Sequence, residues 1–124
     1  MGKKILIVDD NSDNLDLFST VLKCSGYETL EAKDGLEGIR IAQTEKPHLI
    51  LMDIQMPVMD GFKALQFLRS ESTTKDIPSI ALTSYCLEEG RDGFLKLGFV
   101  DFIQKPIKLK EFIKTIEGHL GQVI

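Results

Sequence analysis

Short apolar runs alternate with amphipathic helical patterns along the chain, and this alternation limits the fold more than any other feature. The first run, KILIVD at Lys4–Asp9, is short and rich in β-branched residues, which is typical of a strand buried on both faces. Comparable runs follow at residues 27–32, 48–53, 78–84 and 99–104, of which 27–32 is the weakest. Because a helical pattern follows each run, we expect five strands and five helices in strict alternation.

Local signals mark where the first helices begin and end. Gly26 is expected to end the first helix, and Pro47 the second. Asp34 with Glu37 three residues later forms a pattern like a capping box, which predicts the start of the second helix. Asp60 is expected to cap the third helix and to have no chemical role.

The last two helices differ in regularity. The fourth is expected at about Leu87–Leu97 and contains Gly90 and Gly93. Each interior glycine costs roughly 0.5–1 kcal/mol relative to alanine, so this helix should be the least stable of the five. The fifth helix has one continuous apolar stripe, made of Leu109, Phe112, Ile113, Ile116 and Leu120.

This order of elements predicts an α/β fold with a five-stranded parallel sheet and helices on both faces. Right-handed crossovers leave few topologies, and we expect the flavodoxin-like (βα)5 arrangement with strand order 2-1-3-4-5. The 124 residues suffice for one domain with a hydrophobic core, so residues 1–124 are expected to form a single domain. Ligands of such folds bind at the carboxyl ends of the strands.

Composition narrows the classes of partner. The formal net charge of −4 and the pI of about 5.1 give no electrostatic support for binding nucleic acid or acidic lipid. No apolar run approaches the roughly 20 residues that span a bilayer, and no signal-peptide pattern begins the sequence. The two cysteines, Cys24 and Cys86, are typical of free thiols in a reducing compartment. We expect a cytoplasmic protein that binds neither membrane nor nucleic acid.

Polar residues follow the predicted strands at the points where the strands end. Asp9 and Asp10 follow the first strand, Asp53 the third, Thr83 the fourth and Lys105 the fifth. Because the ends of parallel strands meet at one edge, three carboxylates should converge there with one lysine. Close like charges favour a bound cation, and an all-oxygen donor set suits a hard ion such as Mg²⁺, or Mn²⁺.

These groups together indicate phosphoryl transfer onto a carboxylate. Asp53 would act as the nucleophile and form an acyl phosphate. A divalent cation would screen the repulsion between this anion and an anionic donor. Thr83 supplies a hydroxyl donor and Lys105 a compact positive charge, so both suit the oxygens of the new phosphoryl group.

Four segments carry a resemblance to a known family. The chain resembles the receiver domain of two-component response regulators in ILIVDDN, LILMDIQMPVMDG, IALTSY and FIQKPI, in the order and spacing of that family. The resemblance covers essentially the full length. It implies that Asp53 is the phosphoacceptor and that Mg²⁺ is bound by the side chains of Asp10 and Asp53. The carbonyl of Gln55 would bind the ion directly, and Asp9 largely through water.

The resemblance also implies a conformational switch. Thr83 would be the switch hydroxyl, Phe102 the switch aromatic residue and Lys105 the lysine that binds phosphate. The peptide bond between Lys105 and Pro106 would be cis. Two departures are mild: Ser84 stands where alanine is commoner, and Phe102 lacks the phenol hydroxyl of the frequent tyrosine.

The function implied by the resemblance is that of a phosphorelay switch. A histidine kinase or a histidine phosphotransfer protein would supply the phosphoryl group, because His48 begins the third strand and His119 has no evident partner. A downstream protein would bind the face formed by the helix at 87–97, the strand at 99–104 and the helix at 109–120. The domain would assist its own phosphorylation and dephosphorylation without acting as an enzyme on a separate substrate.

Alternatives remain for the site and for the protein. Asp9 and Asp10 could instead cap the first helix, since carboxylates ahead of a helix are favoured by its free N–H groups. The chain could be a receiver module excised from a larger hybrid kinase or regulator. An aspartate-nucleophile phosphatase is the nearest enzymatic alternative, although no nucleophile at the end of the first strand and no capping insertion are visible.

Overall fold

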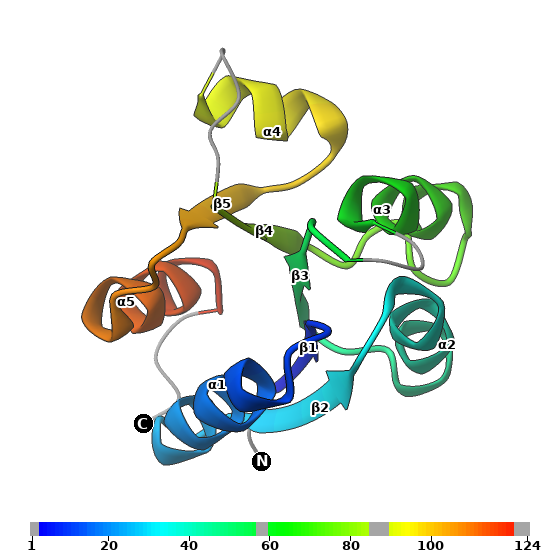
Figure 1. Cartoon of the computed structure of the whole chain (residues 1–124). Helices are drawn as coiled ribbons and strands as arrows, with labels where there is room; N and C mark the ends of the chain where they lie inside the picture. The colour runs from blue at the N-terminus through cyan, green and yellow to red at the C-terminus, as the bar shows by residue number, and fades with distance from the viewer. Residues whose placement is uncertain (1–2, 57–59, 85–89, 121–124) are drawn as a thin grey trace.

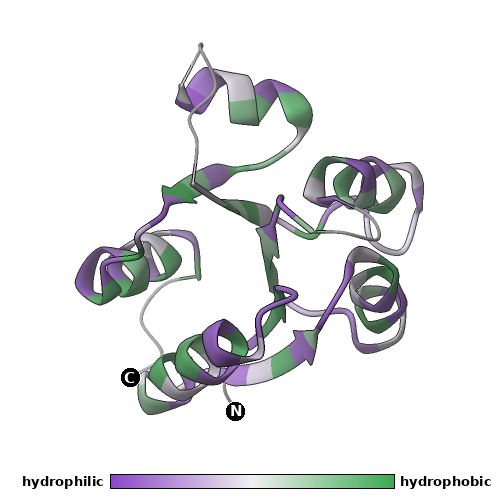
Figure 2. Ribbon diagram, viewed as in Figure 1, coloured by the Kyte–Doolittle hydropathy of each residue, from purple (hydrophilic) through white to green (hydrophobic). Residues whose placement is uncertain are grey.

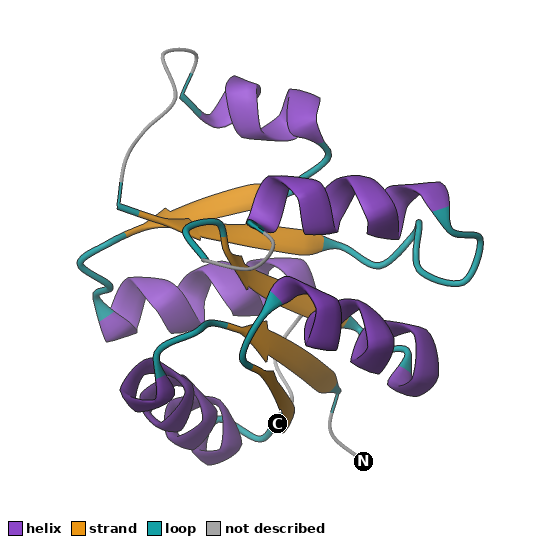
Figure 3. Ribbon diagram, turned by 45° about the vertical axis from the view of Figure 1, so that its right-hand side comes forward, coloured by secondary structure: helices purple, strands orange, loops and turns teal. Residues whose placement is uncertain are grey.

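The computed structural model describes residues 3–56, 60–84 and 90–120, and this part of the chain alternates five strands with five helices. The strands form one parallel sheet in the order β2-β1-β3-β4-β5, with helices on both sides (Figures 1 and 3). The predicted fold class and strand order are confirmed. The elements are β1 Lys4–Val8, α1 Ser12–Cys24, β2 Glu28–Ala32, α2 Gly35–Glu45, β3 Leu49–Asp53, α3 Gly61–Ser70, β4 Ser79–Thr83, α4 Arg91–Leu97, β5 Asp101–Gln104 and α5 Leu109–Leu120.

Alternate residues of the central strands face two separate cores. Ile5 and Ile7 of β1 pack in the core beneath α1 and α5, whereas Leu6 and Val8 pack in the core beneath α2, α3 and α4. Strand β3 is buried along its whole length and is mostly green in Figure 2, while the helices show both green and purple. The apolar runs of the sequence are therefore strands buried on both faces, as predicted.

Side-chain caps fix the starts of three helices. Asn11 caps α1 and Asp34 caps α2, each by accepting a hydrogen bond from the backbone N–H three residues later. The alternative in which Asp9 or Asp10 caps the first helix is wrong, because Asn11 takes that role. Asp60 caps α3 in the same way, at 2.9 Å, as predicted.

The fourth helix and the fifth strand are shorter than the patterns suggested. Helix α4 is described from Arg91, and its expected start at residues 87–89 lies outside the described residues. Gly98, at φ 108°, ends α4, and the N–H of Phe99 bonds back to the carbonyl of Phe94. Phe99 thus completes the helix end, so β5 begins at Asp101 and not at residue 99.

None of the helices in the described ranges combines the length and the apolar character that crossing a membrane requires. The two cores account for most of the apolar side chains of the sheet. Tightly packed contacts also hold the ends of the strands. The closest involves Gly61, the first residue of α3, whose N–H donates to the carbonyl of Ile54 at 3.3 Å.

We expect Gly61→Ala to destabilise the protein by about 1–3 kcal/mol through overpacking. A Cβ at this position would lie 2.7 Å from the Cα of Ile54 and 2.9 Å from the carbonyl oxygen of Asp53, so the backbone itself must shift. Gly118→Ala in α5 is the matched control, because its Cβ would enter open space and alanine favours a helix by up to about 1 kcal/mol. Urea unfolding measures both; equal stability of the two variants would contradict the close packing.

Candidate functional site

Three carboxylates meet at the carboxyl edge of the sheet. Asp53 is the last residue of β3, and Asp9 and Asp10 follow β1, which pairs with β3 in parallel register. One carboxylate oxygen of each residue lies within 4.8 Å of those of the other two. The structure therefore brings together the three acidic residues that the strand ends predicted.

Asp9 is the most completely buried member of this acidic cluster, with 0% of its surface exposed. Its Oδ1 accepts a hydrogen bond from the backbone N–H of Asn11 at 2.9 Å, and its Oδ2 accepts one from Nδ2 of Asn14 at 3.2 Å. Burial, followed by the negative charge of Asp53, raises the pKa of the Asp9 carboxyl, although these bonds and Lys105 oppose the rise. The carboxylate form of Asp9 is therefore under electrostatic strain.

Asp53 is held by two partners on opposite oxygens. Its Oδ1 accepts the backbone N–H of Gln55 at 2.9 Å, and Nζ of Lys105 lies 3.1 Å from its Oδ2. Only 2% of Asp53 is exposed, whereas Asp10 is exposed. The cost of burying the Asp53 charge is thus offset by one lysine and one amide.

Residues at the ends of β4 and β5 complete the site. Thr83 is fully buried at the end of β4, and its carbonyl accepts the backbone N–H of Lys105 at 2.6 Å. The peptide bond between Lys105 and Pro106 is cis. Phe102 of β5 is half-buried, and its ring stacks on Phe94 of α4 with centroids 4.8 Å apart. All of the predicted site residues thus lie at this edge or on the strands that end there.

Several polar contacts around the site were not foreseen from the sequence. Asn14 reaches Asp9 from the first turn of α1, and the hydroxyl of Ser84 donates to Oε1 of Gln55 at 2.6 Å. An asparagine directly before a helical pattern is a recognised cap signal and could have identified Asn11. No such signal marks Asn14 or the contact between Ser84 and Gln55, because both depend on how two loops are placed in space.

The expectation that His119 has no partner is wrong. Nε2 of His119 lies 3.0 Å from Oδ2 of Asp101, and Nε of Arg91 lies 3.7 Å from Oδ1 of the same aspartate. Asp101 therefore joins helices α4 and α5 across strand β5. Because Asp101 and His119 are only partly exposed, these contacts form part of the surface expected to bind a downstream protein.

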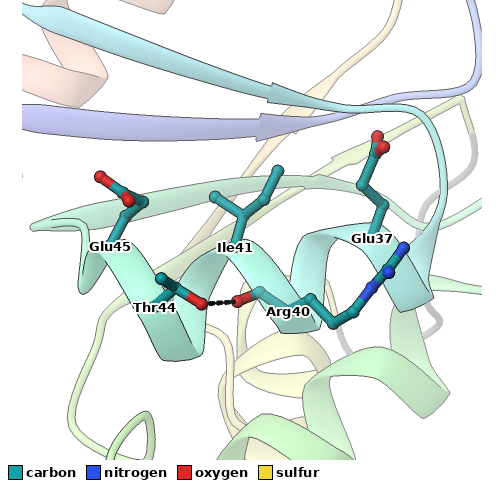
Figure 4. A pocket seen from close by; sticks show the side chains of 5 residues that line it. All are labelled: Glu37, Arg40, Ile41, Thr44 and Glu45. Carbon is teal, nitrogen blue, oxygen red and sulfur yellow. Dashed lines mark hydrogen bonds between the residues drawn. The ribbon is translucent and has the colours of Figure 1, made fainter.

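A hollow of about 330 Å³ lies on α2 and is lined by Glu37, Arg40, Ile41, Thr44 and Glu45 (Figure 4). The hydroxyl of Thr44 is occupied by the carbonyl of Arg40 at 2.9 Å. The lining consists of charged and apolar side chains of a single helix without a thiol or an imidazole. We therefore assign this hollow no chemistry.

The donor atoms of the acidic cluster fit a hard divalent cation. Asp9, Asp10 and Asp53 offer carboxylate oxygens and no nitrogen or sulfur, which matches the preference of Mg²⁺ or Mn²⁺. The raised pKa of Asp9 indicates that the cluster lacks positive charge beyond that of Lys105. A cation held here would relieve that repulsion, and a nucleophilic carboxylate would remain beside it.

Known proteins share both the sequence pattern and the fold. The model of the response regulator receiver domain matches residues 5–117. The polar-differentiation response regulator DivK of Brucella anthropi is 37% identical over 121 residues, which cover 98% of this chain and 98% of that protein. Annotated relatives of the same name in Brucella ovis show the same identity and coverage.

Solved structures agree with this match. The chemotaxis protein CheY4 of Vibrio cholerae has a TM-score of 0.88 and 30% identity, covering 96% of this chain and 99% of that one. The receiver domain of sensor histidine kinase PA1611 from Pseudomonas aeruginosa has a TM-score of 0.87 and 32% identity, covering 98% and 100%, and its active-site cleft coordinates a magnesium ion. The chain belongs to the response regulator receiver domain family, and it is a phosphorelay signalling switch of the two-component type.

Proposed function

We propose that this domain accepts a phosphoryl group on Asp53 from a histidine kinase or a histidine phosphotransfer protein, in a step that depends on Mg²⁺ or Mn²⁺. One observation carries the proposal: Asp53 is a buried carboxylate whose two oxygens are held by the backbone of Gln55 and by Lys105. A carboxylate fixed in this way is already positioned for attack on phosphorus.

The residues of the chain then have separate roles in the transfer. A carboxylate oxygen of Asp53 forms the bond to phosphorus, while the bond between phosphorus and the donor imidazole breaks. Lys105, now paired with Asp53, would contact an oxygen of the arriving phosphoryl group and neutralise part of its charge. Thr83 ends the neighbouring strand and would donate its hydroxyl to a second oxygen after a movement of its loop.

The cation would be held by Asp9, Asp10 and Asp53, together with the backbone carbonyl of Gln55. When bound, it supplies positive charge that lowers the repulsion between donor and acceptor. Asn11 and Asn14 hold Asp9 from the helix side, so the carboxylate keeps its position. Because these groups favour both the forward transfer and the later attack by water, the domain would assist its own phosphorylation and dephosphorylation.

A groove beside the site supports the approach of a protein donor. It has a volume of about 270 Å³ and lies between α1 and the segment that follows β5. Its lining includes Leu17 of α1, which is 46% exposed, together with Lys105 and Ile107. A partner that presents a phosphohistidine to Asp53 would cover this apolar surface.

Signal output would pass through the face formed by α4, β5 and α5 to a downstream protein. Phe102 stacks on Phe94, so an inward turn of Phe102 would remove a contact that holds α4 against the sheet. Helix α4 has seven residues and begins at Gly90 without a side-chain cap, which makes it the least anchored helix at its start. Phosphorylation would thereby change the position or order of α4.

The same proposal includes the organisation and the place of the protein. We propose that residues 1–124 form one domain, since every described strand belongs to a single sheet. The free thiol of Cys24 is exposed, which suits the reducing conditions of the cytoplasm. No contact with nucleic acid or membrane is part of the proposed mechanism.

Asp53→Asn should abolish phosphorylation by acetyl phosphate with Mg²⁺, because the amide is not a nucleophile. Intact-mass measurement should show one added phosphoryl group on the unmodified chain and none on the variant. Asp60→Asn is the matched control, since asparagine caps α3 as well as aspartate does. Equal labelling of the two variants would contradict the assignment of Asp53.

Removing divalent cations should make stability depend on pH through Asp9. Its pKa is raised in the folded protein, so the folded state keeps the proton to higher pH than the unfolded state. Stability without metal should therefore fall as the pH rises from the ordinary carboxyl range through the raised pKa. Mg²⁺ at ten times its Kd should add about 1.4 kcal/mol near neutral pH, and this gain should disappear on acidification.

Urea unfolding between about pH 4 and pH 8, with and without MgCl₂, measures this linkage. In Asp9→Asn, both the fall in stability with pH and most of the gain from Mg²⁺ should be reduced. Glu45→Gln is a suitable control, because Glu45 pairs only with exposed Lys4 at the far end of β1 among the described residues. An unchanged pH profile in Asp9→Asn would show that another group is responsible.

Beryllofluoride with Mg²⁺ should increase hydrogen exchange in α4, because it occupies the place of the phosphoryl group and releases the contact between Phe94 and Phe102. Helix α2 packs on the same core but lies away from this contact, so its exchange should stay constant and serves as the internal control. Unchanged protection of Arg91–Leu97 would rule out α4 as the switching element. Phe102→Ala should raise α4 exchange without beryllofluoride.

A further inference from the structure

One hydrogen bond joins the two loops that leave β3 and β4 at the site. The hydroxyl of Ser84 donates to Oε1 of Gln55 at 2.6 Å, and both residues are exposed. Ser84 directly follows Thr83, and Gln55 lies two residues after Asp53. Since β3 and β4 are neighbours in the sheet, the bond runs from one strand end to the next.

Gln55 is held at both ends. Its backbone N–H donates to Oδ1 of Asp53 at 2.9 Å, while its side chain is bonded to Ser84. The carboxamide therefore extends from the loop of the acceptor residue to the loop of the neighbouring strand. Without the Ser84 hydroxyl, the described residues provide no printed partner for the Gln55 side chain, and its rotamers would become free.

The direction of attack gives this bond a consequence. Phosphoryl transfer requires the entering and leaving groups to lie roughly in line through phosphorus. Asp53 is 2% exposed and lies at the base of the site, so a phosphoryl group on it projects toward solvent. A small donor or a water molecule must then approach from the solvent side, past the loops that contain Gln55 and Ser84.

We propose that Ser84 is a positioning residue that holds the Gln55 carboxamide across the solvent approach to Asp53. The held carboxamide slows two reactions: uptake of phosphoryl from a small-molecule donor and hydrolysis of the acyl phosphate. The inference rests on the proposed role of Asp53 and adds a determinant of how long the phosphorylated state lasts. Ser84 touches neither Asp53 nor phosphorus in this role and acts through Gln55.

Both reactions are balanced without a further reactant. In uptake, an oxygen of Asp53 bonds to phosphorus, and acetate leaves from acetyl phosphate. In hydrolysis, the oxygen of water bonds to phosphorus, the bond from phosphorus to the Asp53 oxygen breaks, and a proton passes to solvent. The products are inorganic phosphate and the original carboxylate.

The test compares Ser84→Ala, Gln55→Ala and the double variant with the unmodified protein. Rates of labelling by acetyl phosphate and of loss of phosphoryl are followed by intact mass in the presence of Mg²⁺. Each single variant should raise both rates about two- to tenfold, the range that one neutral hydrogen bond can supply. The double variant should be no faster than the faster single variant, because the two side chains act as one unit.

Two controls separate positioning from a general change in the loop. Ser84→Thr keeps the hydroxyl and should retain the original rates, and Ser70→Ala removes an exposed hydroxyl from α3 and should do the same. Side-chain ¹⁵N relaxation of Gln55 in the unphosphorylated protein should show an ordered amide in the original and Ser84→Thr proteins. The amide should become mobile in Ser84→Ala.

Unchanged or slower reactions in Ser84→Ala, additive effects in the double variant, or an equally ordered Gln55 amide in Ser84→Ala would each overturn the inference. Failure of the proposed function gives a different result, in which even the unmodified protein gains no phosphoryl group. The relaxation measurement does not need phosphorylation, so it decides in that case whether Ser84 holds Gln55.

Discussion

The repulsion between two buried carboxylates is the constraint on which the site depends. Asp9 and Asp53 lie side by side because β1 and β3 are parallel neighbours, and each is almost fully buried. The surrounding groups hold both in place, through Asn11 and Asn14 on one side and Lys105 on the other. Their partners leave net negative charge, and this is why the site suits a cation and an electrophilic phosphoryl group.

The sheet connects this electrostatic centre to the surface that would contact a downstream protein. The carbonyl of Thr83 and the N–H of Lys105 are joined at 2.6 Å, so the ends of β4 and β5 are linked at the site. Farther along β5, Phe102 packs on α4, while Asp101 contacts both α4 and α5. A displacement at Thr83 therefore has a short packed route to both helices of that face.

The sequence was sufficient for the fold and for the main members of the site, because both follow from local patterns. Apolar runs fixed the strands, and the polar residues after them predicted the convergence of Asp9, Asp10 and Asp53. The contacts of Asn14, Ser84 and His119 could not be predicted, because each joins segments whose relative placement depends on loop geometry. The start of β5 was misplaced for a related reason: Phe99 bonds to the end of α4 instead of to the sheet.

The close packing of Gly61 explains why one stretch of this sequence is so characteristic. Any side chain at this position would collide with the backbone that directly follows the acceptor aspartate. The eight positions from Asp53 to Gly61 therefore have a length and an end residue set by geometry, whatever partner the protein serves. A chain could change its surface freely and still be traceable by this interval, because losing the glycine would displace the very residue that is to be phosphorylated.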